Sequence, residues 1–205
     1  MGMPERDRVS VDVSGVGPRI STERLLLRPW DPDDAESALE VYGTDEVARW
    51  MAPAMACVPD VDAMRALLAE WADVLEPPRG RWAIALAGSG ELVGGVSLLP
   101  MPPGDVDLEI GWQLKPAAWG QGLAAEAGHA VAHYAFQFGI DELFAVVRPR
   151  NTRGAATARR VGMEWVGDTG KYYDLHLQVY RLRKGELDQP RLVSTPLDPW
   201  QDPSA

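Results

Sequence analysis

Hydrophobic and polar residues alternate near the start of the chain and then recur with helical spacing. In Arg19–Trp30, Leu25 and Leu27 alternate in position with Arg24 and Arg28, which predicts a strand. Asp31, with the proline and acids after it, predicts the first turn of a helix, because its side chain can accept from free backbone N–H groups there. Asp60 predicts the start of a second helix, whose apolar stripe is typical of a core-facing surface: Met64, Leu67, Leu68, Trp71 and Leu75.

Three strand-like runs follow, and the short breaks between them favour an antiparallel meander: Arg81–Leu86, Leu92–Leu99 and Val106–Leu114. A glycine-rich turn then leads into a predicted helix that runs to about Phe138. A strand, a helix and two final strands complete the pattern: Glu142–Val147, Asn151–Val161, Met163–Val166 and His176–Arg183. The order β-α-α-β-β-β-α-β-α-β-β predicts an α/β fold around a single sheet.

These elements predict one domain over residues 19–185. Residues 1–18 carry charges and glycines without an apolar core, so we expect a flexible leader rather than a signal peptide. Residues 186–205 contain four prolines and are expected to form an extended Pro-rich C-terminal arm.

Composition narrows the function classes. The formal net charge of -10 argues against a nucleic-acid partner and against an anionic membrane surface. No apolar run approaches the ~18 residues that a membrane-spanning helix needs. The single cysteine, Cys57, excludes an internal disulfide, fits a reducing cytoplasm, and has apolar neighbours that favour a packing role. We therefore expect a cytoplasmic protein, either a monomer or a homodimer.

The segment Trp119–Ala127, WGQGLAAEA, places two glycines at the start of a helix, which is typical of a turn that binds an anion. One interpretation is a dinucleotide site, because Gly120-x-Gly122-x-x-Ala125 formally fits the Rossmann fingerprint. Its context argues against this, since more than a hundred residues precede the turn and five separate it from its strand. The other interpretation is a site for the pyrophosphate of a coenzyme A thioester.

Four segments favour the coenzyme A interpretation by resemblance: TERLLLRPWDPDDAE, LEIGWQLKPAAWGQGLAAEA, VRPRNTRGAATARRVGM and KYYDLHLQVYRLRKGEL. With them the chain resembles the GNAT superfamily of acetyl-CoA-dependent N-acetyltransferases, in particular its RimJ/RimL-type branch, over about residues 20–183. The resemblance implies the GNAT fold, a single mixed, mostly antiparallel sheet flanked by helices, with a central splayed strand. It also implies an enzyme that transfers an acetyl group from acetyl-CoA to a primary amine.

The resemblance also assigns coenzyme contacts. The family pattern [Gln/Arg]-x-x-Gly-x-[Gly/Ala] falls on residues 119–124, where Trp119 replaces the usual Gln or Arg. It implies that backbone N–H groups of five consecutive residues hold the pyrophosphate: Gln121, Gly122, Leu123, Ala124 and Ala125. It further implies that a strand pairs with the pantetheine arm through Trp112, Gln113 and Leu114, and that Asn151 contacts this arm. Without the resemblance, Asn151 is equally well explained as a turn residue.

Five arginines fall within thirteen residues that contain no acid: Arg148, Arg150, Arg153, Arg159 and Arg160. Beside a glycine turn such a cluster could meet the phosphates of coenzyme A, and Arg153 and Arg159 are the candidate contacts. A solvated helix face is the alternative.

Amine acetylation needs a base, a contact for the oxyanion and a thiolate that can leave. Glu109 is the candidate general base, directly or through a water, with an ordinary exposed strand carboxylate as the alternative. Backbone N–H groups near Trp112 and Gln113 are the candidate oxyanion donors. Gly154 replaces the Ser that many relatives use as general acid, which leaves Thr157, Tyr172 and Tyr173 as candidates. A thiolate can also leave without an acid.

Other chemistry stays open. His129 and His133 share a helix face, but a third ligand is not evident, so no metal is expected. The alternatives to an enzyme of this type are a non-catalytic acyl-CoA-binding sensor domain and an NAD(P)-dependent oxidoreductase. The acceptor is either a protein N-terminus or a small-molecule amine, and the acidic surface mildly favours a cationic one.

Overall fold

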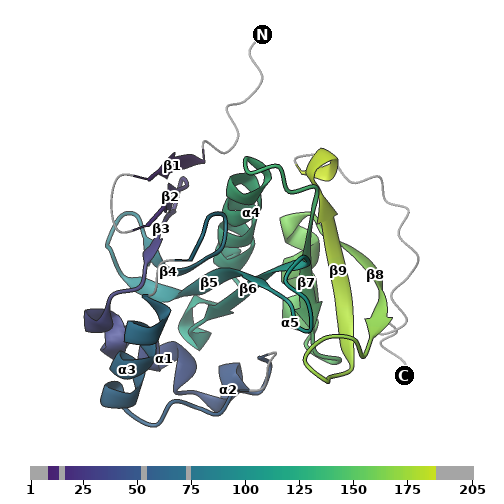
Figure 1. Cartoon of the computed structure of the whole chain (residues 1–205). Helices are drawn as coiled ribbons and strands as arrows, with labels where there is room; N and C mark the ends of the chain where they lie inside the picture. Colours follow the sequence, from purple (N-terminus) through teal and green to yellow (C-terminus); the bar gives the residue numbers. More distant parts are fainter. Residues whose placement is uncertain (1–8, 14–16, 52–54, 73–74, 188–205) are drawn as a thin grey trace.

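The computed structural model describes residues 9–13, 17–51, 55–72 and 75–187. Within these ranges the chain forms one nine-stranded sheet flanked by helices (Figure 1). The strands lie in the order β1-β2-β3-β4-β5-β6-β7-β9-β8, so that the sheet follows the chain until its last two strands. Their bounds are β1 (Ser10–Asp12), β2 (Arg19–Ser21), β3 (Leu25–Pro29), β4 (Gly80–Leu86), β5 (Leu92–Pro100), β6 (Leu108–Leu114), β7 (Glu142–Val147), β8 (Glu164–Thr169) and β9 (Leu177–Arg183).

Two helical segments begin near their predicted starts because an aspartate caps each, Asp31 at η1, which leads into α1, and Asp60 at α3. The Asp31 carboxylate accepts from the Asp33 N–H at 2.9 Å, and Asp60 accepts from the Ala63 N–H at 2.8 Å. One short helix, α2, was not predicted. The α-helices are α1 (Ala35–Tyr42), α2 (Asp45–Ala48), α3 (Val61–Trp71), α4 (Leu123–Phe136) and α5 (Thr152–Val161), and the 3₁₀ turns are η1 (Pro32–Asp34), η2 (Pro116–Ala118) and η3 (Lys184–Glu186).

The N-terminal region differs from the sequence prediction. Arg19–Trp30, predicted as one strand, contains the hairpin β2–β3, because the Thr22 N–H donates to the Leu25 carbonyl at 2.9 Å and reverses the chain. β1 lies within residues 1–18, where no strand was predicted, and it pairs with β2. At the other end of the chain, the predicted C-terminal arm lies outside the described residues from 188 onward.

The sheet has two antiparallel parts that meet at β6 and β7. Strands β1 to β6 are antiparallel, as are β7, β9 and β8. β6 and β7 run parallel and are paired at Glu109 and Phe144, beyond which they diverge. The prediction of a mixed, mostly antiparallel sheet with a central splayed strand is therefore confirmed.

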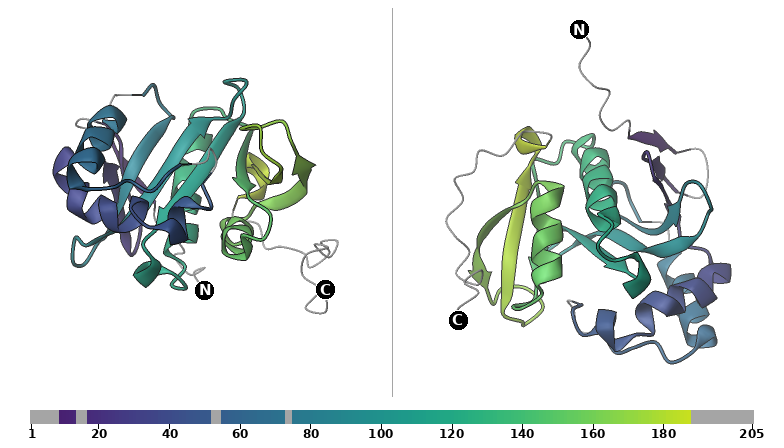
Figure 2. Two further views of the ribbon diagram at one scale, coloured as in Figure 1. Left: turned by 90° about the horizontal axis from the view of Figure 1, so that it is seen from below. Right: turned by 180° about the vertical axis from the view of Figure 1, so that it is seen from behind.

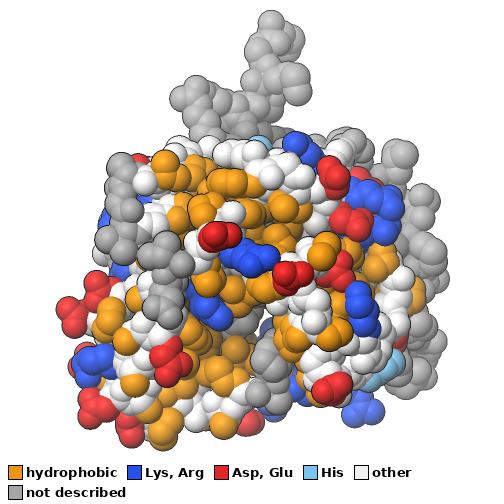
Figure 3. Space-filling model, viewed as in Figure 1, with side chains coloured by type: hydrophobic (Ala, Val, Ile, Leu, Met, Phe, Trp, Pro, Cys, Tyr) orange, Lys and Arg blue, Asp and Glu red, His pale blue; other side chains and the backbone are white. Residues whose placement is uncertain are grey.

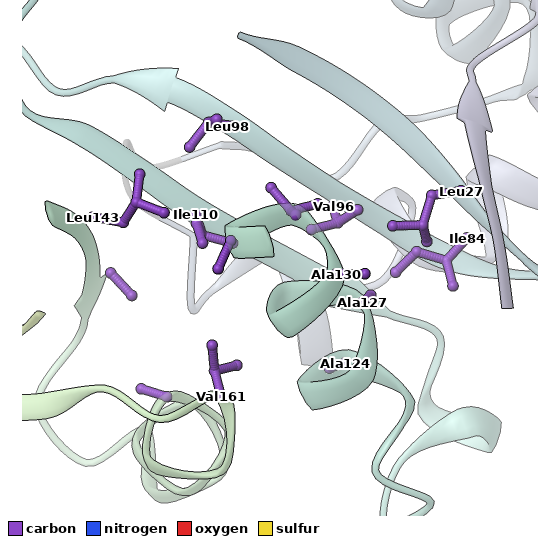
Figure 4. Close-up of a cluster of buried hydrophobic side chains, with 14 of the residues drawn as sticks. Leu27, Ile84, Val96, Leu98, Ile110, Ala124, Ala127, Ala130, Leu143 and Val161 are labelled. Carbon is purple, nitrogen blue, oxygen red and sulfur yellow. The ribbon is translucent and has the colours of Figure 1, made fainter. Parts of the chain in front are cut away.

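Helices cover both faces of the sheet. α4 and α5 lie over the face seen from behind in the right-hand view of Figure 2. Figure 4 shows Val96 and Ile110 of the sheet in one buried cluster with Ala124, Ala127 and Ala130 of α4, whose small side chains let the helix approach the sheet. α1 and α3 pack on the opposite face against Ala83 and Ala85, which alternate with the residues that face α4.

Two further expectations concern location and the cysteine. Among the helices that the structure describes, none combines the length and the apolar character needed to cross a membrane. Cys57 is exposed, so the packing role predicted for it is wrong. The adjacent Val58 is buried instead, and its N–H donates to the Tyr42 carbonyl at 2.9 Å, so Cys57 is turned outward.

Candidate active site

A cleft of about 580 Å³ opens where β6 and β7 diverge. Residues 109–114 of β6 form one wall and residues 145–147 of β7 form the facing wall. The N-terminal turns of α4 and α5, together with residues 46–51 around α2, complete the lining. Beyond the Glu109–Phe144 pair, the edge of β6 that faces β7 presents its backbone groups to this cleft.

Three β6 residues predicted to bind coenzyme line the cleft, with side chains that alternate in direction. The Trp112 ring packs towards α4, 3.7 Å from where a Cβ on Gly128 would stand. Gln113 points to the other face, where its Oε1 accepts from the Tyr42 hydroxyl at 3.3 Å. Leu114 is buried, and its carbonyl accepts from the Trp119 indole at 2.9 Å, so this tryptophan fixes the loop after the strand.

Gly120 and Gly122 shape the mouth of the cleft at the start of α4. Their φ angles of 79° and 77° lie in the left-handed region, which glycine adopts at little cost. A Cβ would meet nothing within 4 Å at Gly120, and at Gly122 it would meet only the Arg24 guanidinium, 3.7 Å away. This open space adjoins the first N–H groups of α4, so the turn fits an anion.

The five residues of the predicted pyrophosphate turn do not all face the cleft. Gly122, Leu123, Ala124 and Ala125 line it. Gln121 lies outside the lining, because its side chain donates to the Ala117 carbonyl at 3.2 Å and its own carbonyl accepts from Arg24 at 3.1 Å. Gln121 therefore fixes the turn from its outer side.

Asn151 lies at the start of α5 and lines the cleft. Its Oδ1 accepts from the Gly154 N–H at 2.9 Å, so it also caps the helix, as the turn interpretation implied. A Cβ on Gly154 would stand 2.8 Å from the Asn151 amide nitrogen and 3.1 Å from Val147, which explains why no serine stands there. Thr157, one helical turn further on, lines the cleft as well.

The arginine cluster divides between the cleft and other surfaces. Arg153 lines the cleft beside the glycine turn, with its guanidinium 4.2 Å from the centroid of the Trp119 ring. Arg159 does not line it and lies 5.6 Å over the Tyr180 ring. The helical phase explains the difference, because residues seven apart share a face of α5. The cluster members that line the cleft are Arg150, Arg153 and Arg160.

Arg148 joins the two sides of the cleft. Its Nε donates to the Met51 carbonyl at 2.8 Å, which ties the end of β7 to the segment after α2. This segment, including Met51, lines the cleft and forms part of its roof.

Glu109 is partly buried at the point where β6 and β7 separate. Burial raises the pKa of its carboxyl from 4.5 to about 7, although hydrogen bonds from Tyr173 and from the Val146 N–H act to lower it. The Tyr173 hydroxyl donates to Glu109 Oε2 at 2.6 Å. Burial, followed by the neighbouring carboxylate, raises the pKa of Tyr173, which keeps the phenol protonated. A carboxyl with a pKa near 7 can accept and release a proton at neutral pH.

The candidate tyrosines have different partners. The buried Tyr172 donates to Asp107 at 2.8 Å and contributes to the lining of neither the cleft nor its neighbouring cavity. Tyr173, whose φ of 57° turns the chain, reaches Glu109 instead. The geometry therefore favours Tyr173 over Tyr172 for a role beside Glu109.

A second cavity, of about 280 Å³, meets the cleft at Met51, Glu109, Gly111 and Gln113. Its remaining walls come from Trp30 after β3, Met55, α1, α3, β4, β5 and the loop before β9. Figure 3 shows that this face of the molecule is hollowed in its middle. Sequence reasoning missed this cavity because its residues lie far apart in the chain, and its aromatic residues, such as Trp71, have the pattern of ordinary core residues.

The acetyltransferase (GNAT) domain family matches residues 24–164. The chain belongs to the GNAT acetyltransferase family. This GNAT protein is 26% identical over 157 residues to the uncharacterized N-acetyltransferase YoaA of Bacillus subtilis, which covers 76% of this chain and 88% of that protein. It is 30% identical over 135 residues to the uncharacterized N-acetyltransferase p20 of Bacillus licheniformis, and the match covers 64% of this chain and 74% of that protein. The crystal structure of the acetyltransferase from Agrobacterium tumefaciens matches with a TM-score of 0.66 at 25% identity, over 86% of this chain and 99% of that one.

The GNAT protein is thus an acetyltransferase enzyme, and its predicted fold is confirmed. Acetyl-CoA, the donor that GNAT enzymes use generally, fits the residues present. The open glycine turn and the arginines beside it suit its phosphates, and the edge of β6 suits its amide-rich arm. Among the described residues, no three His, Cys, Asp or Glu side chains gather as a metal site.

Proposed function

We propose that the protein transfers the acetyl group of acetyl-CoA to a primary amine, as in the RimJ/RimL-type branch that its sequence resembles. The observation that carries this proposal is the position of Glu109, at which the cleft and the second cavity meet. A thioester held along β6 and an amine held in the second cavity would meet at this carboxylate. A cytoplasmic location is part of the proposal, supported by the single cysteine.

Coenzyme binding is assigned to the cleft. The N–H groups of residues 122–125 and the Arg153 guanidinium would hold phosphates, because both adjoin the open glycine turn. The edge of β6 would pair with the pantetheine amides, with Asn151 facing it from α5. Arg159 and Tyr172, which lie outside the lining, take no part.

The transfer needs one proton to move away from the amine. The amine nitrogen attacks the thioester carbon, the C–N bond forms, and the carbonyl oxygen gains a negative charge beside the Trp112 N–H, on the edge of β6 that faces β7. The Gln113 N–H, the other predicted donor, points to β5 and takes no part. Glu109 accepts the proton that the amine loses. The C–S bond then breaks, and the thiolate leaves and takes a proton from Tyr173, Thr157 or solvent. A tyrosine that gives up its proton regains one from Glu109 through their 2.6 Å hydrogen bond.

Two measurements on the purified protein test this function. Acetyl-CoA is expected to raise the melting temperature, since a ligand at a hundred times its Kd stabilises the native state by ~2.7 kcal/mol. Release of free thiol is expected only when a suitable amine is added. Binding without thiol release across a wide amine panel would favour the sensor alternative. A melting temperature raised by NADH and unmoved by acetyl-CoA would favour the oxidoreductase.

A further inference from the structure

Three aromatic side chains form one wall of the second cavity. The ring centroids of Trp30 and Tyr42 lie 6.2 Å apart, and those of Tyr42 and Trp71 lie 5.1 Å apart, both with edge-to-face geometry. Each ring thus holds its neighbour in place, so the wall is rigid and largely apolar. Such a wall fits a flat or apolar group on the molecule that enters the cavity.

A cation faces the same cavity. Arg81 is partly buried on β4, and its guanidinium lies 5.9 Å from the centroid of the Trp71 ring. Burial lowers the pKa of Arg81, and among the residues that the structure describes Tyr42 is the ionisable neighbour that acts to raise it. Two other partly buried arginines are paired with carboxylates, Arg28 with Asp34 at 2.7 Å and Arg181 with Glu164 at 2.6 Å. Arg79 and Arg148 instead donate to backbone carbonyls, at 3.2 Å and 2.8 Å.

No such pair exists for Arg81 among the described residues, within which no carboxylate lies 4.0 Å or less from its guanidinium. A partly desolvated cation without a counter-charge is unfavourable, and an anionic ligand would compensate it. Arginine binds carboxylates with particular strength because its planar fork can donate two parallel hydrogen bonds.

The sheet register places this cation opposite the proposed base. Arg81 is paired with Ser97, Ser97 with Gly111, and Glu109 lies two residues from Gly111 on the same side of β6. Arg81 and Glu109 therefore reach into one cavity from strands about 10 Å apart, two strand spacings. An acceptor between them would present an anionic group to one end and its amine to the other.

We propose that the acceptor is a small amine of the amino-acid class, with a carboxylate that binds Arg81 and an apolar or aromatic body that packs on Trp30, Tyr42 and Trp71. This inference rests on the proposed acetyl transfer and specifies its acceptor. The cavity of about 280 Å³ lies just below the ~300 Å³ at which pockets for drug-sized ligands begin, so it suits a smaller molecule such as an amino acid. The chain's net charge of -10 governs the approach of ligands from a distance, whereas Arg81 acts on a ligand already in contact.

The test compares matched acceptors on the full-length protein. Thiol release from acetyl-CoA is measured with L-phenylalanine, L-phenylalaninamide and phenethylamine, for the wild type, Arg81→Met and Arg65→Met. Arg65 lies on the exposed side of α3, paired with Asp62, and serves as the control. The wild type is expected to prefer the carboxylate by ~10–100-fold in kcat/KM. Arg81→Met should remove this preference and Arg65→Met should keep it. The comparison between variants cancels differences in amine basicity.

A binding measurement separates the inference from the proposed function. Calorimetry with coenzyme A present compares N-acetyl-L-phenylalanine with its amide, neither of which carries an amine. If the acid binds the wild type more tightly than the amide does, and Arg81→Met loses this difference, the inference is supported. If in addition no amine is acetylated, only the proposed acetyl transfer is refuted. Equal binding of acid and amide, or binding of neither, overturns the inference on the wild type alone. The inference is also overturned if amines are acetylated and Arg81→Met leaves the preference for the carboxylate-bearing acceptor unchanged.

Discussion

Replacing Glu109 by Gln is expected to stabilise the protein at neutral and alkaline pH. The folded-state pKa of about 7 lies above the ordinary value of 4.5. Between these two pH values the unfolded chain has released the proton that the folded chain keeps, so stability falls as pH rises through this window. The free energy of unfolding that is lost amounts to about 3 kcal/mol, at 1.36 kcal/mol per pKa unit, and the whole loss has occurred once the pH is above 7. The neutral amide of Glu109→Gln can still accept the hydrogen bond from Tyr173, and because it does not ionise, stability is not lost as the pH rises.

The assay is urea unfolding from pH 5 to pH 8.5 for the wild type, Glu109→Gln and Glu70→Gln, where Glu70 is an exposed residue of α3. The stability advantage of Glu109→Gln should grow from pH 5 to pH 7 and then level off, and Glu70→Gln should parallel the wild type. The same variant should lose ~10²–10⁴ in kcat/KM together with the acidic limb near pH 7, because its amide cannot accept a proton. Stability curves that stay parallel would show that Glu109 titrates as an ordinary surface carboxylate.

Three further outcomes are expected. Gly122→Val should weaken acetyl-CoA binding sharply in calorimetry, whereas Gly139→Val, which imposes the same strain at φ 77° outside the cleft, should leave affinity unchanged; equal effects would place the phosphates elsewhere. Arg153→Ala should cost about 1–3 kcal/mol of coenzyme affinity and Arg159→Ala almost none, and a reversed order would contradict the assigned helix face. Tyr173→Phe removes a hydrogen bond that lowers the pKa of Glu109, so the acidic limb of the pH–rate profile should move to higher pH. A limb that stays in place would show that the Tyr173 hydroxyl does not affect the titrating group.

Local signals in the sequence were sufficient for most of the fold. Asp31 and Asp60 cap helices in the structure as they were predicted to, because capping depends on neighbouring residues alone. The hairpin β2–β3 and the strand β1 were missed for the opposite reason. β1 is only three residues long and is held by its pairing with β2, which depends on residues later in the chain.

The site was predictable only where one short segment builds it. The glycine turn and the start of α5 each lie within a few residues, so their positions in the cleft follow from local geometry. Helical phase also decides which arginines of α5 line the cleft, so Arg159 could have been excluded from the sequence alone. The wall formed by Trp30, Tyr42 and Trp71 could not be foreseen, because three distant segments supply it.

Of the residues that the structure describes, only four line both cavities, so different parts of the chain build each of them. Segments before about residue 85 supply the aromatic wall and Arg81 of the cavity proposed for the acceptor, and segments after residue 108 supply most of the lining of the cleft proposed for the coenzyme. Substitutions in the first group can change which molecule is modified while the donor stays bound as before. The proposed acceptor could therefore change in evolution with little effect on the donor, whereas Met51, Glu109, Gly111 and Gln113 line both cavities and are constrained by both ligands.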